Sequence, residues 1–211
     1  YSGFNLSAGA RNLIIGGGDA NKATGRQLTT GSDNTMIGNN AGALLVSGNK
    51  NTLLGFQAGY GLGDSASDNI AIGSKGSGNI NIGAGSGNYQ TSAEYNISIG
   101  ADAGLKTTEN VRNVNIGFQA GYEGETGSND NVHIGTKAGH KSKGSYNMFT
   151  GYYAGFENTS GQNNVFMGSE AGYNNTTGNK NIGIGYQTGY TNSTGSKNIL
   201  IGDEAGRNGG S

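Results

Sequence analysis

The amino-acid sequence predicts an all-β fold, a parallel β-solenoid (β-roll) of about twelve 17-residue coils. Two observations lead to this prediction. A unit that reads Asn-apolar-x-apolar-Gly begins at Asn164, Asn181 and Asn198, and each step is 17 residues long. The two apolar places of the unit lie two residues apart, which is the periodicity of a β-strand. A repeat this regular and this short is typical of a stacked array with one coil per repeat.

The repeat runs through almost the whole chain. Most steps between units are 16 to 18 residues, with one step of 22 and one of 10, and the Gly four residues after the opening Asn is always present. The opening residues are Asn12, Asn34, Asn51, Asn69, Asn79, Asn96, Asn113, Asn131, Asn147, Asn164, Asn181 and Asn198. Asn favours turn geometry, and stacked amides can hydrogen-bond to one another. We therefore predict a structural Asn ladder made of Asn34, Asn51, Asn96, Asn113, Asn131, Asn147, Asn164, Asn181 and Asn198.

The sequence divides into one long domain with two short ends. Residues 1–11 resemble a degraded repeat or a cap, residues 12–206 form the β-solenoid, and the polar, Gly-rich residues 207–211 are expected to be a flexible tail. The units that open at Asn69 and Asn79 are irregular, and the array is close to regular from Asn96 onward. No segment of ten or more residues shows helical periodicity.

The second apolar place of each unit is β-branched in most repeats, which favours a packed ladder of parallel strands. We expect this inner ladder to fill the interior of the coils. It comprises Ile15, Ile37, Leu54, Ile72, Ile82, Ile99, Ile116, Ile134, Met167, Ile184 and Ile201. A small residue seven places after the Asn, usually Ala, is expected to point inward as well.

The middle place of each strand should face the opposite way. Its residues are apolar towards both ends of the array and polar in the centre, where Asn81, Ser98, Asn115 and His133 occur. Apolar residues on a second face suggest contacts between chains, and we expect a homo-trimer. The oligomer face predicted in this way comprises Ile14, Met36, Leu53, Phe149, Phe166 and Leu200.

Composition excludes several classes of function. The 211 residues include 43 Gly and no Pro, Cys or Trp, only 13% are charged, and the net charge is −1. Such a chain lacks the basic surface that nucleic-acid binding requires, so we expect no nucleic acid as partner. It also lacks an apolar run near the roughly 20 residues of a membrane span. Without Cys, neither disulfides nor thiolate metal sites can form.

The repeat resembles two known families, on strands such as Asn69-Ile70-Ala71-Ile72-Gly73 and Asn181-Ile182-Gly183-Ile184-Gly185. It is similar to the head repeats of trimeric autotransporter adhesins, which are left-handed parallel β-rolls. It also looks like the Asn- and Gly-rich shaft repeats of phage-type tail fibres. The resemblance covers the chain from Asn12 to Gly206, and it implies a trimeric, non-enzymatic rod.

Candidate chemistry is sparse. The two histidines, His133 and His140, occupy repeat positions and read as repeat variants; only if three chains met near His133 would three imidazoles be able to hold an anion or a metal. Carboxylates show no recurring pair suited to acid–base work. We therefore expect no enzyme activity, no catalytic residue, no cofactor and no metal.

Two kinds of repeated side chain leave alternatives open. Hydroxyl pairs precede the turn Gly at Thr29-Thr30, Thr159-Ser160, Thr176-Thr177 and Ser193-Thr194, and they suit either turn chemistry or an ice-binding row. Two aromatic rows suit either packing between coils or between chains, or sugar binding. The rows are Tyr60, Tyr122, Phe156, Tyr173 and Tyr190, and Phe56, Phe118, Tyr152 and Tyr186.

These observations favour a structural and adhesive fibre segment, of the tail-fibre or adhesin-head kind, that is extracellular, on a cell surface or on a virion. Such a rod would project or form a receptor-binding surface, and a cell-surface glycan or protein would be its partner. The alternatives are a monomeric β-solenoid that binds ice or polysaccharide, and a subunit of a self-assembling extracellular filament.

Overall fold

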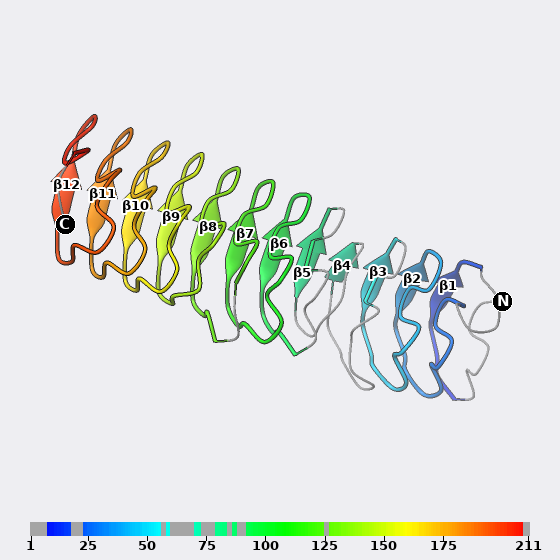
Figure 1. Ribbon diagram of the computed structural model, residues 1–211. Coiled ribbons are helices and arrows are strands. Elements are labelled where there is room, and N and C mark those ends of the chain that lie inside the picture. Colours follow the sequence, from blue (N-terminus) through cyan, green and yellow to red (C-terminus); the bar gives the residue numbers. More distant parts are fainter. Residues whose placement is uncertain are drawn as a thin grey trace.

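The computed structural model describes residues 8–17, 23–55, 58–59, 70–72, 79–83, 86–87, 92–124 and 127–208. Within these residues the chain is all-β, without helix, and twelve parallel strands form one sheet in sequence order (Figure 1). The strands are β1 (Leu13–Ile15), β2 (Thr35–Ile37), β3 (Thr52–Leu54), β4 (Ile70–Ile72), β5 (Ile80–Ile82), β6 (Ile97–Ile99), β7 (Val114–Ile116), β8 (Val132–Ile134), β9 (Met148–Thr150), β10 (Val165–Met167), β11 (Ile182–Ile184) and β12 (Ile199–Ile201). The solenoid predicted from the repeat is confirmed.

Each strand pairs with the equivalent strand of the next repeat. Val165 of β10 lies opposite Ile182 of β11, and Met167 lies opposite Ile184, so equivalent residues line up along the rod. Figure 1 shows the strands standing one behind another, with β1 and β12 at opposite ends of the stack.

A glycine ends every strand, and Gly168 shows why. Its φ of 139° lies in a region that L side chains rarely adopt. A Cβ at this position would also collide with the carbonyl group of Gly185 in the next coil. The chain therefore leaves the sheet where two backbones approach too closely for any side chain.

The structure reverses the predicted inner ladder. Its side chains point out of the coil, away from the interior, and Ile184 for example keeps 38% of its surface exposed. The exposed members are Ile15, Ile72, Ile82, Ile134, Met167, Ile184 and Ile201, and the half-buried members are Ile37, Leu54, Ile99 and Ile116. The expectation that this place fills the interior was wrong.

The predicted oligomer face is reversed in the same way. Its residues occupy the middle place of each strand, which points into the coil of the chain itself. Met36, Leu53, Phe149 and Phe166 are buried, and Ile14 and Leu200, near the two ends, are half-buried. Side chains in this position cannot form contacts between chains.

The opening Asn decides which face is inside. Asn164 and the middle residue Phe166 are two apart, so both side chains point to the same side of the strand. Asn164 is buried, since its amide Nδ2 donates to the carbonyl oxygens of Gly178 (2.8 Å) and of the Asn147 side chain (3.2 Å). With its polar atoms satisfied, Asn is stable inside, and the two apolar places between Asn and Gly must face out.

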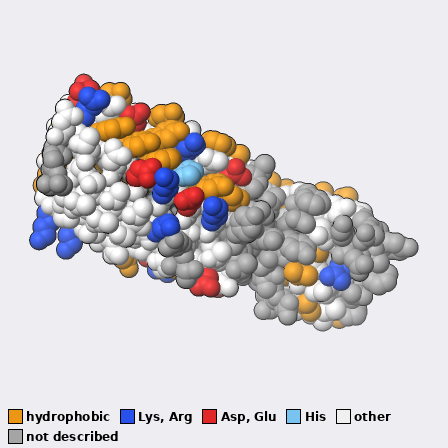
Figure 2. Space-filling model, viewed as in Figure 1, with side chains coloured by type: hydrophobic (Ala, Val, Ile, Leu, Met, Phe, Trp, Pro, Cys, Tyr) orange, Lys and Arg blue, Asp and Glu red, His pale blue; other side chains and the backbone are white. Residues whose placement is uncertain are grey.

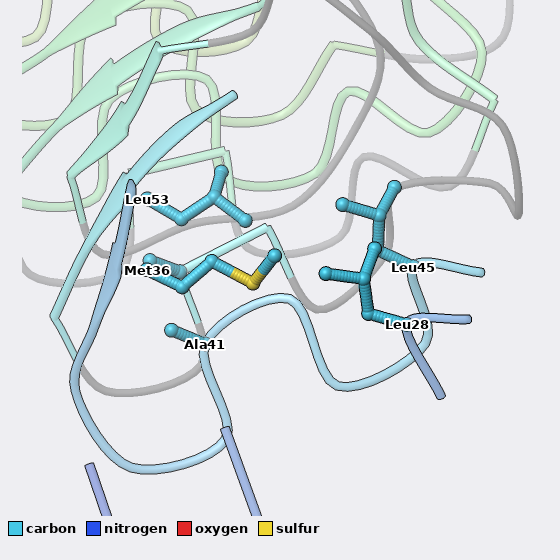
Figure 3. Close-up of a cluster of buried hydrophobic side chains, with 6 residues drawn as sticks. Leu28, Met36, Ala41, Leu45 and Leu53 are labelled. Atoms are coloured by element: carbon cyan, nitrogen blue, oxygen red, sulfur yellow. The ribbon is translucent and has the colours of Figure 1, made fainter. Parts of the chain in front are cut away.

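The interior changes character along the rod. Each coil consists of one strand and a segment without strand that leads to the next strand, which we call the return side of the coil. Near the N-terminal end, Met36 and Leu53 from the sheet face Leu28 and Leu45 from the return side (Figure 3). Near the other end, aromatic rings stack along the axis, with 5.4 Å between the ring centroids of Phe149 and Phe166. The Ala at the seventh place is buried in both regions, as expected for a narrow coil, at Ala41, Ala58, Ala103, Ala120, Ala138, Ala154 and Ala171.

The ends of the chain are only partly covered by the structure. Residues 1–7 of the predicted cap and residues 209–211 of the predicted tail lie outside the described residues. The backbone N–H of Ala8 donates to the carbonyl oxygen of Thr29, and the carbonyl oxygen of Arg207 accepts from the N–H of Thr191. Residues at both ends therefore continue the hydrogen bonding of the array. Across the described part of the chain, no helix has the length and apolarity needed to cross a membrane.

Candidate binding surfaces

The Asn ladder holds the coils together from inside. The carbonyl oxygen Oδ1 of Asn164 accepts the backbone N–H of Asn181 at 2.9 Å, and Oδ1 of Asn147 accepts from the backbone N–H of Asn164 at the same distance. The same bond recurs along the rod, for example from Asn113 to Asn96 (2.9 Å). Because these amides bond to protein groups and are buried, the Asn ladder is part of the frame and offers no exposed ligand site.

A second interior ladder escaped the sequence analysis. Asn158, Asn175 and Asn192 follow the opening Asn by eleven residues and are buried on the return side of the coil. The Nδ2 of Asn175 donates to Oδ1 of Asn158 (3.0 Å), and the Nδ2 of Asn158 donates to the Ser142 hydroxyl (3.2 Å). The signal for it was present, because Asn recurs at this place in consecutive repeats.

The outward side of the sheet forms the first candidate surface, which we call the outer sheet face. It consists of the first and third places of β1–β12, at which nearly all residues are Ile, Val, Leu or Met. Its most exposed side chains include Ile70, Ile134, Met148, Met167 and Ile184, beside the four end residues Leu13, Ile15, Ile199 and Ile201. The face is regular, apolar and almost free of charge.

The second candidate surface is an aromatic stack on the return side, formed by Tyr122, His140, Phe156, Tyr173 and Tyr190. Neighbouring rings lie 4.9 to 5.2 Å apart between centroids, with planes inclined by 8° to 23°. Lys141 Nζ lies 5.4 Å from the centroid of the Phe156 ring, and Lys106 Nζ lies 5.1 Å from that of Tyr122. Figure 2 shows hydrophobic side chains in rows over the C-terminal half of the molecule, with acidic and basic side chains between them.

Ion pairs bridge consecutive coils beside these rings. Lys141 Nζ contacts both carboxylate oxygens of Glu157, at 2.8 and 2.9 Å. Burial among the rings lowers the pKa of His140 and raises that of Tyr173. On another part of the coil, the hydrogen bonds from the Arg112 guanidinium hold the pKa of Asp130 below its ordinary value. These charges are paired within the chain, so they stabilise the stack of coils and leave little net field for a charged ligand.

A third surface follows the strands at the fifth place after the opening Asn. Phe118, Tyr152 and Tyr186 occupy this place in every second coil, and Thr136 and Ser169 occupy it in the coils between them. We call the three aromatic residues the alternate row. All three are exposed, by 46%, 52% and 48% respectively. Phe56 and Tyr60, which the sequence places in the aromatic rows, lie outside the described residues.

The first hydroxyl of three of the pairs, at Thr29, Thr159 and Thr176, is used within the fold. The Thr159 hydroxyl donates to the carbonyl oxygen of Thr176, and the Thr176 hydroxyl donates to that of Ser193, both at 3.0 Å. These bonds join one coil to the next, which favours turn chemistry as the role of this row.

The polar residues in the central part of the array point into the coils of their own chain, as the other middle places do. His133 Nδ1 donates to Asn115 Oδ1 (2.8 Å), and burial lowers the pKa of His133 to about 3. His133 Nε2, Asn115 Nδ2 and the Ser98 hydroxyl are buried without a hydrogen-bond partner. His133 lies inside its own coil, so three imidazoles cannot meet around an axis between chains. Among the residues that the structure describes, no group of three or more His, Asp or Glu lies close enough to hold a metal ion.

One open groove crosses the turns of the last coils. Gln162, Asn179 and Ser196 line it together with the residue that follows each of them. The lining is polar and includes two basic residues, Lys180 and Lys197, without a carboxylate. It contains no pair of groups suited to acid–base catalysis.

The comparisons with known proteins add no identification. No protein-family model, no curated protein and no solved structure matches this chain.

Proposed function

We propose that this chain is a structural and adhesive segment of an extracellular fibre, in which copies of the chain pack through the outer sheet face. The observation that carries the proposal is the exposure of this face. Soluble proteins rarely leave a long, contiguous apolar surface in water, and such a surface usually marks an interaction site. The face extends for about 55 Å if twelve strands are spaced by about 4.8 Å.

A second copy of the same chain is the partner that fits this surface best. The face repeats at every coil and its strands are parallel, so an identical face offers the same spacing over its whole length. It carries almost no charge, which excludes a partner held mainly by ion pairs. Three copies can each turn one sheet towards a common axis, and this closed arrangement needs only one kind of interface.

The adhesive role follows from the shape of such an assembly. A rod that buries its sheet faces along the axis would present its return sides, with their rings and turns, to the surroundings. We place it outside the cell, on a cell surface or on a virion, with a glycan or a protein receptor as its partner. Repeated loops on a rigid frame are a common way to present binding residues.

The test is the native mass of the protein. A trimer should sediment and scatter light at three times the chain mass of 21.4 kDa. The double variant Ile134→Asn, Ile184→Asn should remain folded, because both side chains are exposed, yet it should sediment as a single chain. The matched control is Thr177→Asn, Thr194→Asn, which changes two exposed residues of the turns and should leave the trimer intact. A wild-type protein that stays at 21.4 kDa at micromolar concentration would refute the assembly.

The regularity of the same face supports a second candidate function, ice binding by a monomer. Flat rows of equivalent side chains at a constant coil spacing can order water in a matching lattice. The candidate surface would then be the outer sheet face, since the hydroxyls of Thr159 and Thr176 are bonded to the backbone of the next coil. A monomeric wild type that depresses the freezing point of water below the melting point of ice, and loses this activity on Ile134→Asn, would establish it.

A further inference from the structure

We propose that the alternate row, formed by Phe118, Tyr152 and Tyr186, is a binding platform for an extended β-1,4-linked polysaccharide. The proposal names a ligand class for the adhesive role stated above and rests on that part of it. Three observations carry it: the spacing of the rings, the openness of their faces, and the hydrogen-bonding side chains beside them.

The spacing follows from the register of the coils. Phe118, Tyr152 and Tyr186 occupy the same place in every second coil, because the strands before them pair residue by residue. Coils spaced by about 4.8 Å therefore place these rings about 9.6 Å apart along a line. In an extended β-1,4-linked glycan each sugar is turned over relative to the one before it, so every second sugar presents the same face. The repeat of two sugars matches the repeat of two coils.

The rings of the alternate row are not stacked on one another. In the aromatic stack each ring covers the next, as Phe156 and Tyr173 do with 5.2 Å between their centroids. In the alternate row, Thr136 and Ser169 separate the rings, and among the described residues no ring contact joins any two of the three. Tyr152 has one ring neighbour outside the row, Tyr153, whose ring is tilted by 58° with 4.4 Å between the centroids. About half of each side chain is exposed. The apolar face of a pyranose ring can therefore stack on each of them.

Hydrogen-bonding groups flank the row at the next place of the coil. Gln119 follows Phe118, Gln187 follows Tyr186, and Lys137 and Glu170 follow the small residues between the rings. Gln187 is itself buried, and its Nε2 donates to Glu170 Oε2 (2.6 Å), so it holds the half-buried Glu170 carboxylate beside the row. Lys137 Nζ lies 5.3 Å from the Tyr153 ring centroid. Amide, carboxylate and ammonium groups are the partners that sugar hydroxyls require, and ligand sites combine apolar surface with a few such groups. Because both signs of charge are present, the expected glycan is uncharged.

Soluble hexaoses test the proposal on the intact protein. We expect one or more of cello-, chito-, xylo- and mannohexaose to bind, with affinity rising from the disaccharide to the hexaose. Phe118 to Tyr186 spans four coils, about 19 Å, so three rings are engaged only when about five sugars are present. Maltohexaose, whose α-linkages curve the chain, should not bind. Isothermal titration calorimetry gives the affinities.

Three variants make the test specific. The triple variant Phe118→Ala, Tyr152→Ala, Tyr186→Ala should lose at least tenfold in affinity, whereas Tyr146→Ala, which removes a tyrosine exposed by 58% outside the row, should lose less than twofold. The variant Thr136→Tyr, Ser169→Tyr fills the gaps, so adjacent rings should cover one another and binding should fall although aromatic surface is added. Circular dichroism checks the fold of each variant.

Several outcomes would overturn the platform. These are the absence of binding to all four β-linked hexaoses, equal binding of maltohexaose, or an affinity that the triple variant leaves unchanged. A change of native mass in the triple variant would show that the row is covered by another chain, which also refutes it. The native mass of the wild type tests the trimer separately, so failure of one proposal is not failure of the other.

Discussion

Phe149 and Ile184 show the two roles that a residue of a strand takes in this fold. Phe149 occupies a middle place, is fully buried and stacks on the rings of His133 and Phe166. Ile184 occupies a third place and faces out. Because the interior is only a few side chains wide, each buried residue carries a large share of the core of its coil.

Truncation at the two places should have different costs. Phe149→Ala should lower the free energy of unfolding by about 3–5 kcal/mol, because it removes a ring from a packed core. Ile184→Ala should cost less than about 1 kcal/mol in the isolated chain, since that side chain is already partly in water. Urea unfolding followed by circular dichroism measures both, at a protein concentration where sedimentation shows a single chain. Equal costs would mean that the two faces of the strand are assigned wrongly.

His133 should make the stability depend on pH. Burial lowers its pKa from 6.5 to about 3, so the unfolded chain takes up a proton at a pH where the folded chain does not. This contribution lowers stability as the pH falls from about 6.5 towards 3, by up to about 1.4 kcal/mol per pH unit.

The variant His133→Asn isolates this effect, because Asn115 shows that an Asn is accepted at the same place of the preceding strand. We expect the difference in unfolding free energy between wild type and variant to shift in favour of the variant as the pH is lowered through this window. Parallel stability curves between pH 7 and pH 4 would show that His133 is not held neutral by burial.

At the scale of one coil, the ladder of Asn164 is the central element. Its amide bonds to both the preceding and the following coil. Nδ2 donates to Asn147 and Gly178, and Oδ1 accepts from the backbone N–H of Asn181. Only a side chain with both a donor and an acceptor at this spot can satisfy the two neighbouring coils.

Asn164→Asp tests this requirement with almost no change of shape. The carboxylate would face two carbonyl oxygens that now accept from Nδ2, and it would be buried, so we expect a loss of about 3–5 kcal/mol. Asn163→Asp makes the same chemical change at the exposed neighbouring residue and should be nearly neutral. Melting temperatures of the two variants supply the comparison, and similar values for both would contradict a structural role for the ladder.

The glycine that ends each strand gives a second test at this scale. Gly168→Ala should destabilise strongly, by more than about 2 kcal/mol, because the new methyl group meets the Gly185 carbonyl and φ is positive. At Gly17 no atom lies within 4 Å of an added Cβ, so Gly17→Ala should be tolerated. A normal melting temperature for Gly168→Ala would show that the coils can separate at little cost.

The sequence predicted the elements better than their orientation. The period of Asn164, Asn181 and Asn198 and the alternation within each unit were sufficient for a parallel solenoid. The predicted inward side was wrong, because the hydrophobicity of Ile and Val favours burial, whereas the position of the buried Asn places them on the outward side. Asn164 and Phe166 lie on one side of the strand, so a buried amide ladder requires a buried middle place. The inward polar residues are stable only through bonds between coils, which a single repeat does not display.

The candidate surfaces were foreseen in part. Both aromatic rows were visible as repeats, but propensity does not reveal which rings cover one another. Tyr122 and His140 lie 4.9 Å apart because the consecutive coils from Tyr122 to Tyr190 all carry a ring at that place. Phe118 and Tyr152, by contrast, are separated by Thr136. That difference depends on coil stacking, and it became apparent only with the register of the strands.

Over the whole molecule, stability should be unevenly distributed. The interior at β6 and β7 contains the Ser98 hydroxyl and Asn115 Nδ2, which are buried without a partner, and each such group costs about 1–3 kcal/mol. The interior at β9 and β10 contains stacked Phe149 and Phe166. Because each coil contacts only its neighbours, such differences remain local.

Hydrogen exchange should therefore be faster in the amides of β6 and β7 than in those of β9 and β10. Exchange measured by NMR or mass spectrometry on the native protein provides the comparison, with the free energy of opening as the readout. Uniform protection across these four strands would mean that the array opens as one cooperative unit.

The hydrogen bonds between coils run along the rod, whereas the covalent chain winds across it, and this geometry has a mechanical consequence. A force that pulls the two ends of the chain apart loads these bonds one coil at a time, starting at an end. Each coil of 17 residues that peels away gives up about 4.8 Å of rod and releases about 55–60 Å of extended chain. A rod of this kind would lengthen in steps under tension and spend work at every step, so it would behave as a shock absorber between whatever is attached to its two ends.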